Sequence, residues 1–238
     1  MQSVRMAKRD LICSLTLLLF AQVFSQDKTT TSTENPDIEI PAEINYTFDI
    51  VYAERLLNAL GTEENVFDWI RKLVASTEKI FQFKNESDNS GLDTKINLKV
   101  VNMALYKPRG MFVDGVRIDD PVYNRTTICL SGAGAAYQVL NACTKTIVAS
   151  VGVGGVTSEN AEKWASSEHW MDGVLAHEMG HTFGLPHDPK EFASPGVVQK
   201  SYAMFAGGNS NRFSSNSNEK YRGWYKRTGH KCLAAMAI

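Results

Sequence analysis

The chain has 238 residues, of which 43% are hydrophobic, 10% aromatic and 21% charged. This is the composition of an ordinary globular protein, and it excludes a collagen-like, coiled-coil or wholly disordered chain. The 25 Lys and Arg residues against 26 Asp and Glu give a formal net charge of −1. No strongly basic field is present, so the charge balance gives no support to a nucleic-acid partner.

The first 25 residues have the features of a secretory signal peptide. Three basic residues precede an apolar run at residues 11–24, and this run is too short to span a bilayer comfortably. Cleavage is expected after Ser25, and an uncleaved signal anchor is the alternative. Because no later stretch is long and apolar enough to span a membrane, we expect a secreted, extracellular protein.

Residues 26–43 are Thr-rich and contain two prolines, which predicts a flexible leader. After cleavage the chain would keep three cysteines, an odd number, so at least one thiol is predicted to be free or paired between chains. Three N-glycosylation sequons fit an exported chain. They begin at Asn45, Asn85 and Asn124.

Strands and helices alternate over residues 44–238, which predicts a single α/β domain. Apolar residues at every second position are typical of strands. The predicted strands cover residues 44–50, 96–100, 126–131 and 146–153. Thr62 is predicted to start a helix because acidic residues follow it in the first turn. The buried face of that helix is predicted to consist of Val66, Trp69, Ile70, Leu73, Thr77 and Ile80.

Two further helices are predicted in the second half of the chain. One covers residues 168–183 and ends at Gly184, after which Pro186 cannot continue it. A loop rich in Gly, Asn and Ser follows at residues 206–219. Ser217 is then expected to cap a last helix, which Gly229 would end.

Three of the five histidines lie within eleven residues. His177 and His181 are four residues apart, so on a helix they project from one face and can share a metal ion. Gly184 permits a tight turn that brings His187 back as a third nitrogen ligand. Three protein ligands with an open fourth position are typical of a catalytic zinc site. The alternative is that these are surface histidines with ordinary hydrogen bonds.

Glu178 directly follows the first predicted ligand and points to the side of the metal position. We expect it to act as the general base, taking a proton from a zinc-activated water that attacks a substrate carbonyl. It would then pass this proton to the leaving amine. On this interpretation, Glu178→Ala keeps zinc bound and abolishes cleavage.

The residues His177-Glu178-x-x-His181-x-x-Gly184-x-x-His187-Asp188 resemble the long motif of the metzincin metallopeptidases. Asp188, directly after the third histidine, makes the chain most similar to the adamalysin (reprolysin) group. The resemblance implies a zinc metalloendopeptidase with one catalytic Zn²⁺.

The same resemblance implies a twisted mixed sheet with an edge strand over the cleft, a long active-site helix and a smaller C-terminal subdomain. Residues 126–131 resemble that edge strand, to which an extended peptide would add. Met204 is the candidate for a methionine turn beneath the zinc site, with an ordinary core methionine as the alternative.

The family resemblance also implies a disulfide between Cys143 and Cys232. Asn216 stands where relatives often have a cysteine, so a second bridge is expected to be missing. Cys129 is then left over, either as a free thiol or as a competitor for Cys143. The leader contains no cysteine that could block the zinc, so a cysteine switch is not expected and the control of latency stays open.

We therefore expect a secreted monomer that hydrolyses extracellular proteins or peptides. One alternative is a catalytically silent, zinc-holding protein that binds peptides or inhibitors in the same cleft. The presence of Glu178 argues against it. A zinc hydrolase of small molecules is a third hypothesis. The sequence leaves open the natural substrate, the cleavage preference and any structural Ca²⁺.

Overall fold

The computed structural model describes residues 35–106, 111–113, 116–118, 125–131, 135–136, 142, 147–165, 171–189, 202–205 and 210–233. The predicted signal peptide and the leader up to residue 34 lie outside this described part. No helix within it combines the length and apolar character that crossing a bilayer requires.

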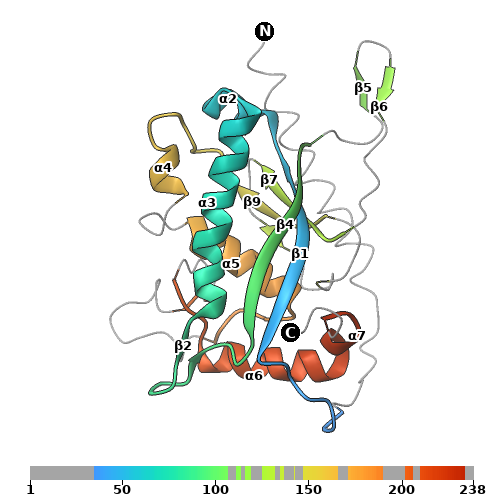
Figure 1. Cartoon of the computed structure of the whole chain (residues 1–238), viewed down its shortest axis with the longest axis vertical. Helices are drawn as coiled ribbons and strands as arrows, with labels where there is room; N and C mark the ends of the chain where they lie inside the picture. The colour runs from blue at the N-terminus through green and yellow to red at the C-terminus, as the bar shows by residue number, and fades with distance from the viewer. Residues whose placement is uncertain are drawn as a thin grey trace.

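A five-stranded mixed sheet in the order β4-β1-β7-β9-β8 forms the centre of the fold (Figure 1). The first four strands in this order pair in parallel, whereas β8 is antiparallel to β9. The strands of this sheet are β1 (Glu43–Tyr52), β4 (Lys95–Leu105), β7 (Thr127–Ser131), β8 (Ala135–Ala136) and β9 (Ile147–Gly152). Two small hairpins are formed by β2 (Lys84–Asn85) with β3 (Ser90–Gly91) and by β5 (Met111–Val113) with β6 (Val116–Ile118). All four predicted strands are confirmed.

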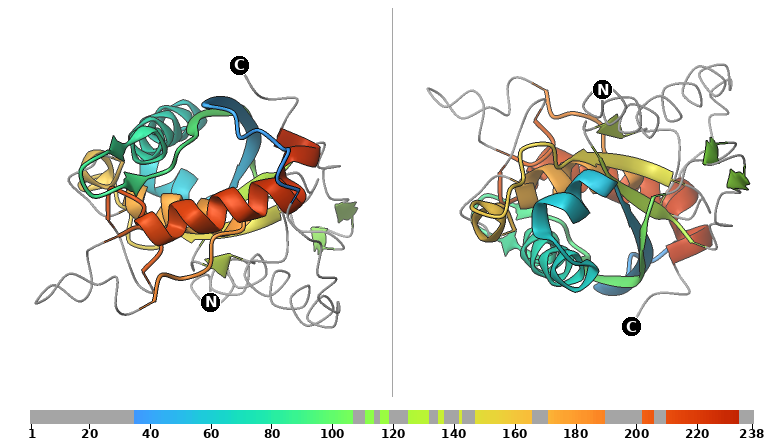
Figure 2. Two further views of the ribbon diagram at one scale, coloured as in Figure 1. Left: turned by 90° about the horizontal axis from the view of Figure 1, so that it is seen from below. Right: turned by 90° about the horizontal axis from the view of Figure 1, so that it is seen from above.

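Two helices, α3 (Glu63–Gln82) and α5 (Met171–Thr182), contact each other, and each also packs against the sheet (Figure 2). The other helical segments are α2 (Glu54–Leu60), α4 (Ala161–Trp164), α6 (Ser215–Trp224), the π-helix η2 (Tyr225–Gly229) and α7 (His230–Leu233). The predicted α/β class is therefore confirmed.

The core lies between the sheet and these helices, as the sequence pattern predicts. In β1, Ile44, Tyr46, Phe48 and Ile50 are at most 1% exposed, because alternate side chains of a strand point to the same face. All six residues of the predicted helical face of α3 are buried. Thr62 caps α3 by accepting a hydrogen bond from the backbone N–H of Asn65.

The last helix differs from its prediction at both ends. Ser214, not Ser217, is the N-cap of α6, and its Oγ accepts a hydrogen bond from the Ser217 N–H. Gly229 does not end the helix, since the chain continues through η2 into α7. Its φ is not positive. It is needed for close packing instead, because a Cβ there would lie 2.6 Å from Trp224 Cζ3.

The strand predicted at residues 126–131 exists, but its predicted position at the edge of the sheet is wrong. Strand β7, which covers most of this range, lies between β1 and β9, and all five of its residues are buried. The edge position next to β9 belongs to β8, which also contacts α5. The physical reason is the long-range pairing of β7 on both sides, which the local sequence does not encode.

The described part of the predicted leader packs onto the domain. Ile38 and Ile40 pack against the core, and Lys226 Nζ donates to the carbonyl oxygen of Pro36 at 3.4 Å. Strand β1 already begins at Glu43. Apolar side chains at alternate positions thus fix a segment that its composition alone predicted to be flexible.

Neither of the two described cysteines, Cys129 and Cys232, is a free thiol. Of the two alternatives predicted for Cys129, the free thiol is therefore wrong. Its side chain is fully buried in β7, beside Val51. Cys143 lies outside the described residues, so its pairing with Cys232 stays a prediction.

Candidate metal centre

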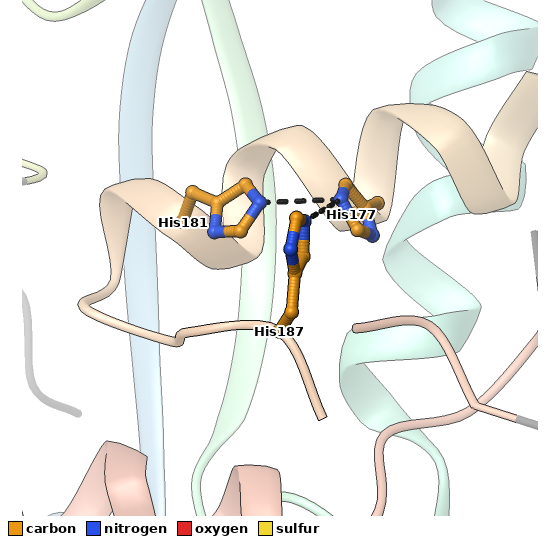
Figure 3. Close-up of side chains that lie close together, drawn as sticks. All are labelled: His177, His181 and His187. Atoms are coloured by element: carbon orange, nitrogen blue, oxygen red, sulfur yellow. Dashed lines mark hydrogen bonds between the residues drawn. The ribbon is translucent and has the colours of Figure 1, made fainter. Parts of the chain in front are cut away.

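Helix α5 carries two of the three predicted metal ligands. His177 and His181 are only 8% and 4% exposed, and both rings lie on one side of the helix, as the four-residue spacing requires. Their Nε2 atoms are 3.2 Å apart (Figure 3). The helix therefore presents two imidazole nitrogens to one point.

The turn after α5 brings the third histidine to the same point. Gly184 has a φ of 75°, and its N–H donates to the carbonyl oxygen of His181 at 3.0 Å. The left-handed conformation favours glycine. A Cβ at this position would also lie 2.2 Å from Trp224 Cδ1. The chain reverses here, and His187 Nε2 lies 3.2 Å from His177 Nε2.

Backbone carbonyls fix the orientation of the two helical imidazoles. His177 Nδ1 lies 2.6 Å from the carbonyl oxygen of Ala203, and His181 Nδ1 lies 2.7 Å from that of Leu185. A carbonyl oxygen only accepts, so each Nδ1 carries the hydrogen and donates it. The lone pair of each neutral ring is then on Nε2, the atom that faces the shared point.

This donor set fits a divalent metal ion. Two Nε2 lone pairs that face each other at 3.2 Å repel, because neither atom of the neutral pair carries a proton. A cation between them removes this repulsion. The ligand atoms of the three histidines all lie within 4.8 Å of one another. Three imidazoles that leave a fourth position open are typical of catalytic zinc.

Burial sets the protonation state that metal binding requires. It lowers the pKa of His181 to about 4 and also lowers that of His177. The neighbouring His187 adds to both effects through like-charge repulsion. The two imidazoles are therefore neutral at pH 7, and neutral imidazole is the form that binds metals.

Glu178 lies on the same helix, between the two ligands in sequence. It is half-buried, and burial raises the pKa of its carboxyl group to about 7. Within the described part of the chain, no hydrogen bond occupies this carboxylate. A carboxylate with a raised pKa and no partner is suited to accept and return a proton near neutral pH.

The segment at residues 202–205 lies against the metal-binding helix at Gly180. A Cβ on Gly180 would come within 2.5 Å of Met204 Sδ, so the fully buried Met204 touches α5 there. The carbonyl oxygen of Met204 also accepts a hydrogen bond from the Asp188 N–H at 2.8 Å. Met204 thus contacts both the metal-binding helix and the residue after His187, and its assignment to a methionine turn stays a prediction.

Sequence reasoning used Asp188 only as a family marker and missed its structural role. Its Oδ1 accepts hydrogen bonds from Ser214 Oγ at 2.6 Å, Asn216 Nδ2 at 3.0 Å and Ser217 Oγ at 3.1 Å. A carboxylate is favourable at the N-terminus of α6, where the helix dipole is positive. The Asn216 side chain therefore ties the first turn of α6 to the residue after the third histidine.

Asp172 and Ser76 form a second contact that the sequence did not reveal. Ser76 Oγ of α3 donates to Asp172 Oδ2 at 2.7 Å, and the N–H of Gly173 donates to Asp172 Oδ1 at 2.8 Å. Both side chains are buried. This pair fastens the first turn of the metal-binding helix to α3.

Comparison with known proteins finds a family match in the second half of the chain. Residues 119–223 match a family model described as Metallo-peptidase family M12. The matched range includes all three histidines, Glu178 and Met204. No protein of curated function matches the chain.

Two similar solved structures differ widely from this chain in sequence. One is titled "Structure of a chaperone-substrate complex", with 14% identity over 78% of this chain and 35% of that chain, and a TM-score of 0.43. The other is metalloproteinase-II from Bacteroides fragilis, with 11% identity over 86% of this chain and 59% of that chain, and a TM-score of 0.35. This chain thus spans less than two thirds of either. The match to Metallo-peptidase family M12, with three histidines that could bind one metal ion, supports a zinc-dependent metallopeptidase.

Proposed function

We propose that the chain is a secreted zinc endopeptidase of the adamalysin type, which hydrolyses peptide bonds of extracellular proteins. The observation that carries this proposal is the convergence of the Nε2 atoms of three histidines, two of which lie on the helix that also carries the half-buried Glu178. The match to Metallo-peptidase family M12 supports the reaction class. Asp188 after the third histidine supports the adamalysin type.

His177, His181 and His187 would hold the ion. Bound zinc supplies an activated water and polarises a carbonyl oxygen. Glu178 accepts a proton from the attacking water on a carboxylate oxygen, holds it, and donates it to the nitrogen of the leaving amine. The carbonyl oxygens of Ala203 and Leu185 keep the Nδ1 protons of the helical ligands in place during this cycle.

Strand β8 is the proposed docking edge for an extended substrate. Among the described residues it pairs only with β9, and it contacts α5, the helix that carries Glu178. A peptide that adds to its outer edge would form main-chain hydrogen bonds and lie along the metal-binding helix. This position replaces residues 126–131, which β1 and β9 enclose.

Casein or fibrinogen digestion by the purified protein, with and without a chelator, tests the proposal. The wild type should cleave, and the chelator should stop it. Glu178→Gln should keep one equivalent of zinc and lose on the order of 10²–10⁴-fold in rate. Glu64→Gln, at an exposed position of α3, is the matched control and should cleave like the wild type.

Metal analysis separates the alternatives. A wild-type protein that binds zinc and peptides but cleaves neither protein substrate would support the zinc-holding binding protein instead. Cleavage by Glu178→Gln at the wild-type rate would show that another group is the general base.

A further inference from the structure

The sequon at residues 85–87 lies in the loop of the β2–β3 hairpin. Asn85 ends β2, and the next four residues, 86–89, are all exposed. Figure 1 shows β2 and this loop projecting from the periphery of the domain. We propose that Asn85 carries an N-linked oligosaccharide, at a higher occupancy than Asn45. This inference rests on the export of the chain but not on its peptidase activity.

The two groups that define the sequon are presented together in this loop. The N–H and Oγ of Ser87 both donate to Asn85 Oδ1, at 3.1 Å and 2.8 Å. Such a turn around an asparagine side chain places its amide and the serine hydroxyl on the same side. A transferase therefore meets both recognition groups on one accessible surface.

The hydrogen bonds of the loop leave the reactive atom available. Both bonds to Asn85 end on Oδ1, and within the described chain its Nδ2 donates none. The rest of the loop holds its shape without this nitrogen, since Lys84 Nζ donates to Asn89 Oδ1 and Ser90 Oγ donates to Asp88 Oδ1. A glycan on Nδ2 thus breaks no contact.

The environment of Asn45 is different. It lies within β1 opposite Asn97 of β4, and its Oδ1 accepts a hydrogen bond from Asn97 Nδ2 at 3.2 Å. The Asn45 side chain is itself exposed, whereas that of Asn85 is half-buried, so the two sites differ in the backbone and not in the exposure of the asparagine. The residues on either side of Asn45, Ile44 and Tyr46, are 0% and 1% exposed. Once β1 has paired, the strand holds this sequon extended against the domain and a transferase cannot bend it. The third sequon, at Asn124, lies outside the described residues.

The modification is a group transfer from a lipid-linked oligosaccharide diphosphate. The bond between Asn85 Nδ2 and the anomeric carbon of the first sugar forms, and the bond from that carbon to the diphosphate oxygen breaks. The diphosphate leaves with the bonding electrons, and a base of the transferase takes one proton from the amide nitrogen. No electron donor or acceptor is needed.

Expression of the full chain in eukaryotic cells tests this proposal. The protein is collected from the medium, and peptide mass spectrometry after treatment with a peptide N-glycosidase gives the occupancy of each sequon. Asn85 should be converted to aspartate to a greater extent than Asn45. Asn85→Gln and Ser87→Ala should each remove one glycan, whereas Ser87→Thr, which keeps the hydroxyl, should retain it.

Two results would overturn the proposal. Secreted protein with Asn85 unmodified, or modified no more than Asn45, would contradict it and leave the chelator-sensitive digestion untouched. A chain that stays in the cells without any glycan would contradict both the glycan and the proposed export. Loss of digestion with Asn85 fully occupied would contradict only the peptidase.

Discussion

His177 and Ala203 are 26 residues apart in sequence, yet the Nδ1–H of the histidine donates to the carbonyl oxygen of the alanine at 2.6 Å. This bond ties a metal ligand on α5 to the segment that carries Met204. It also decides which nitrogen of the ring is free for a metal. The orientation of the ligand thus depends on the backbone of a distant segment. Since the acceptor is a backbone carbonyl, the side chain at position 203 does not form this bond.

Zinc should stabilise the fold through these ligands. A ligand that binds only the folded state adds about 2.7 kcal/mol to the free energy of unfolding when its free concentration is 100 times its dissociation constant. We expect zinc to raise the Tm of the chelator-treated protein, and His187→Ala to reduce this rise strongly. Differential scanning fluorimetry with a zinc titration measures it. His230→Ala, outside the three-histidine cluster, is the control and should keep the full rise in Tm. A rise in Tm of His187→Ala as large as that of the wild type would contradict the ligand assignment.

Gly184 and Gly61 provide a matched pair for the turn after α5. Both have positive φ, at 75° and 85°, but a Cβ on Gly61 meets nothing within 4 Å, whereas one on Gly184 meets Trp224 Cδ1 at 2.2 Å. Gly61→Ala should therefore cost about 1–2 kcal/mol from backbone strain alone. Gly184→Ala should cost about 1–3 kcal/mol more from overpacking.

Urea unfolding measures the loss of unfolding free energy in each of the two variants. Zinc affinity then shows whether the variant also disturbs the metal site. Gly184→Ala should weaken zinc binding, because the turn places His187, while Gly61→Ala should leave it unchanged. Equal losses of stability in the two variants would show that the Trp224 side chain moves to accommodate the new Cβ with no further loss of stability.

The elements with strong local patterns were predictable from the sequence. Alternation identified β1, helical spacing identified the buried face of α3, and Thr62 was identified as a cap. The spacing of His177, Gly184 and His187 likewise predicted that the imidazoles meet, because helix geometry and one left-handed residue determine that path.

Features that depend on distant partners were not predictable. The central position of β7 follows from pairing with β1 and β9, and its five residues show nothing of this order. The start of α6 was misplaced because Ser214 and Ser217 can both cap a helix. Ser214 is the cap because its Oγ accepts from the Ser217 N–H, while Asp188, a partner distant in sequence, accepts from both hydroxyls.

Gly180 should tolerate no side chain while Met204 is present. A Cβ there would lie 2.5 Å from Met204 Sδ and 3.3 Å from Phe213 Cε1. Gly180→Ala should lower the free energy of unfolding by about 1–3 kcal/mol through overpacking. In a Met204→Ala background the same change should cost less, because the sulfur is gone.

A double-mutant cycle in urea tests this contact directly. The expected coupling energy is about 0.5–3 kcal/mol, with the double variant more stable than the sum of the single effects predicts. Additive effects would mean that Met204 does not press on α5 at Gly180.

Asp188 should stabilise the junction between the third ligand and α6. Asp188→Ala removes the acceptor of three side-chain donors, and the two serines among them are fully buried. We expect a loss of about 2–4 kcal/mol, as for other buried networks that lose a charged acceptor. Asn216→Ala removes a single donor and should cost about 1.5–3 kcal/mol at most, since its bond is to a charged group. Urea unfolding compares them, and a smaller loss for Asp188→Ala than for Asn216→Ala would contradict the network.

The bond between Ser76 and Asp172 should hold the first turn of α5 against α3. Ser76→Ala leaves Asp172 Oδ2 buried without its donor at 2.7 Å, which should cost about 1.5–3 kcal/mol. Ser158→Ala, at an exposed position, is the matched control and should stay within about 0.5 kcal/mol of the wild type. Urea unfolding measures both.

Because α5 carries two of the three metal ligands and Glu178, Ser76→Ala should also lower the rate of peptide cleavage at saturating zinc. A variant that loses stability but cleaves at the wild-type rate would show that the contact supports the fold without positioning the site.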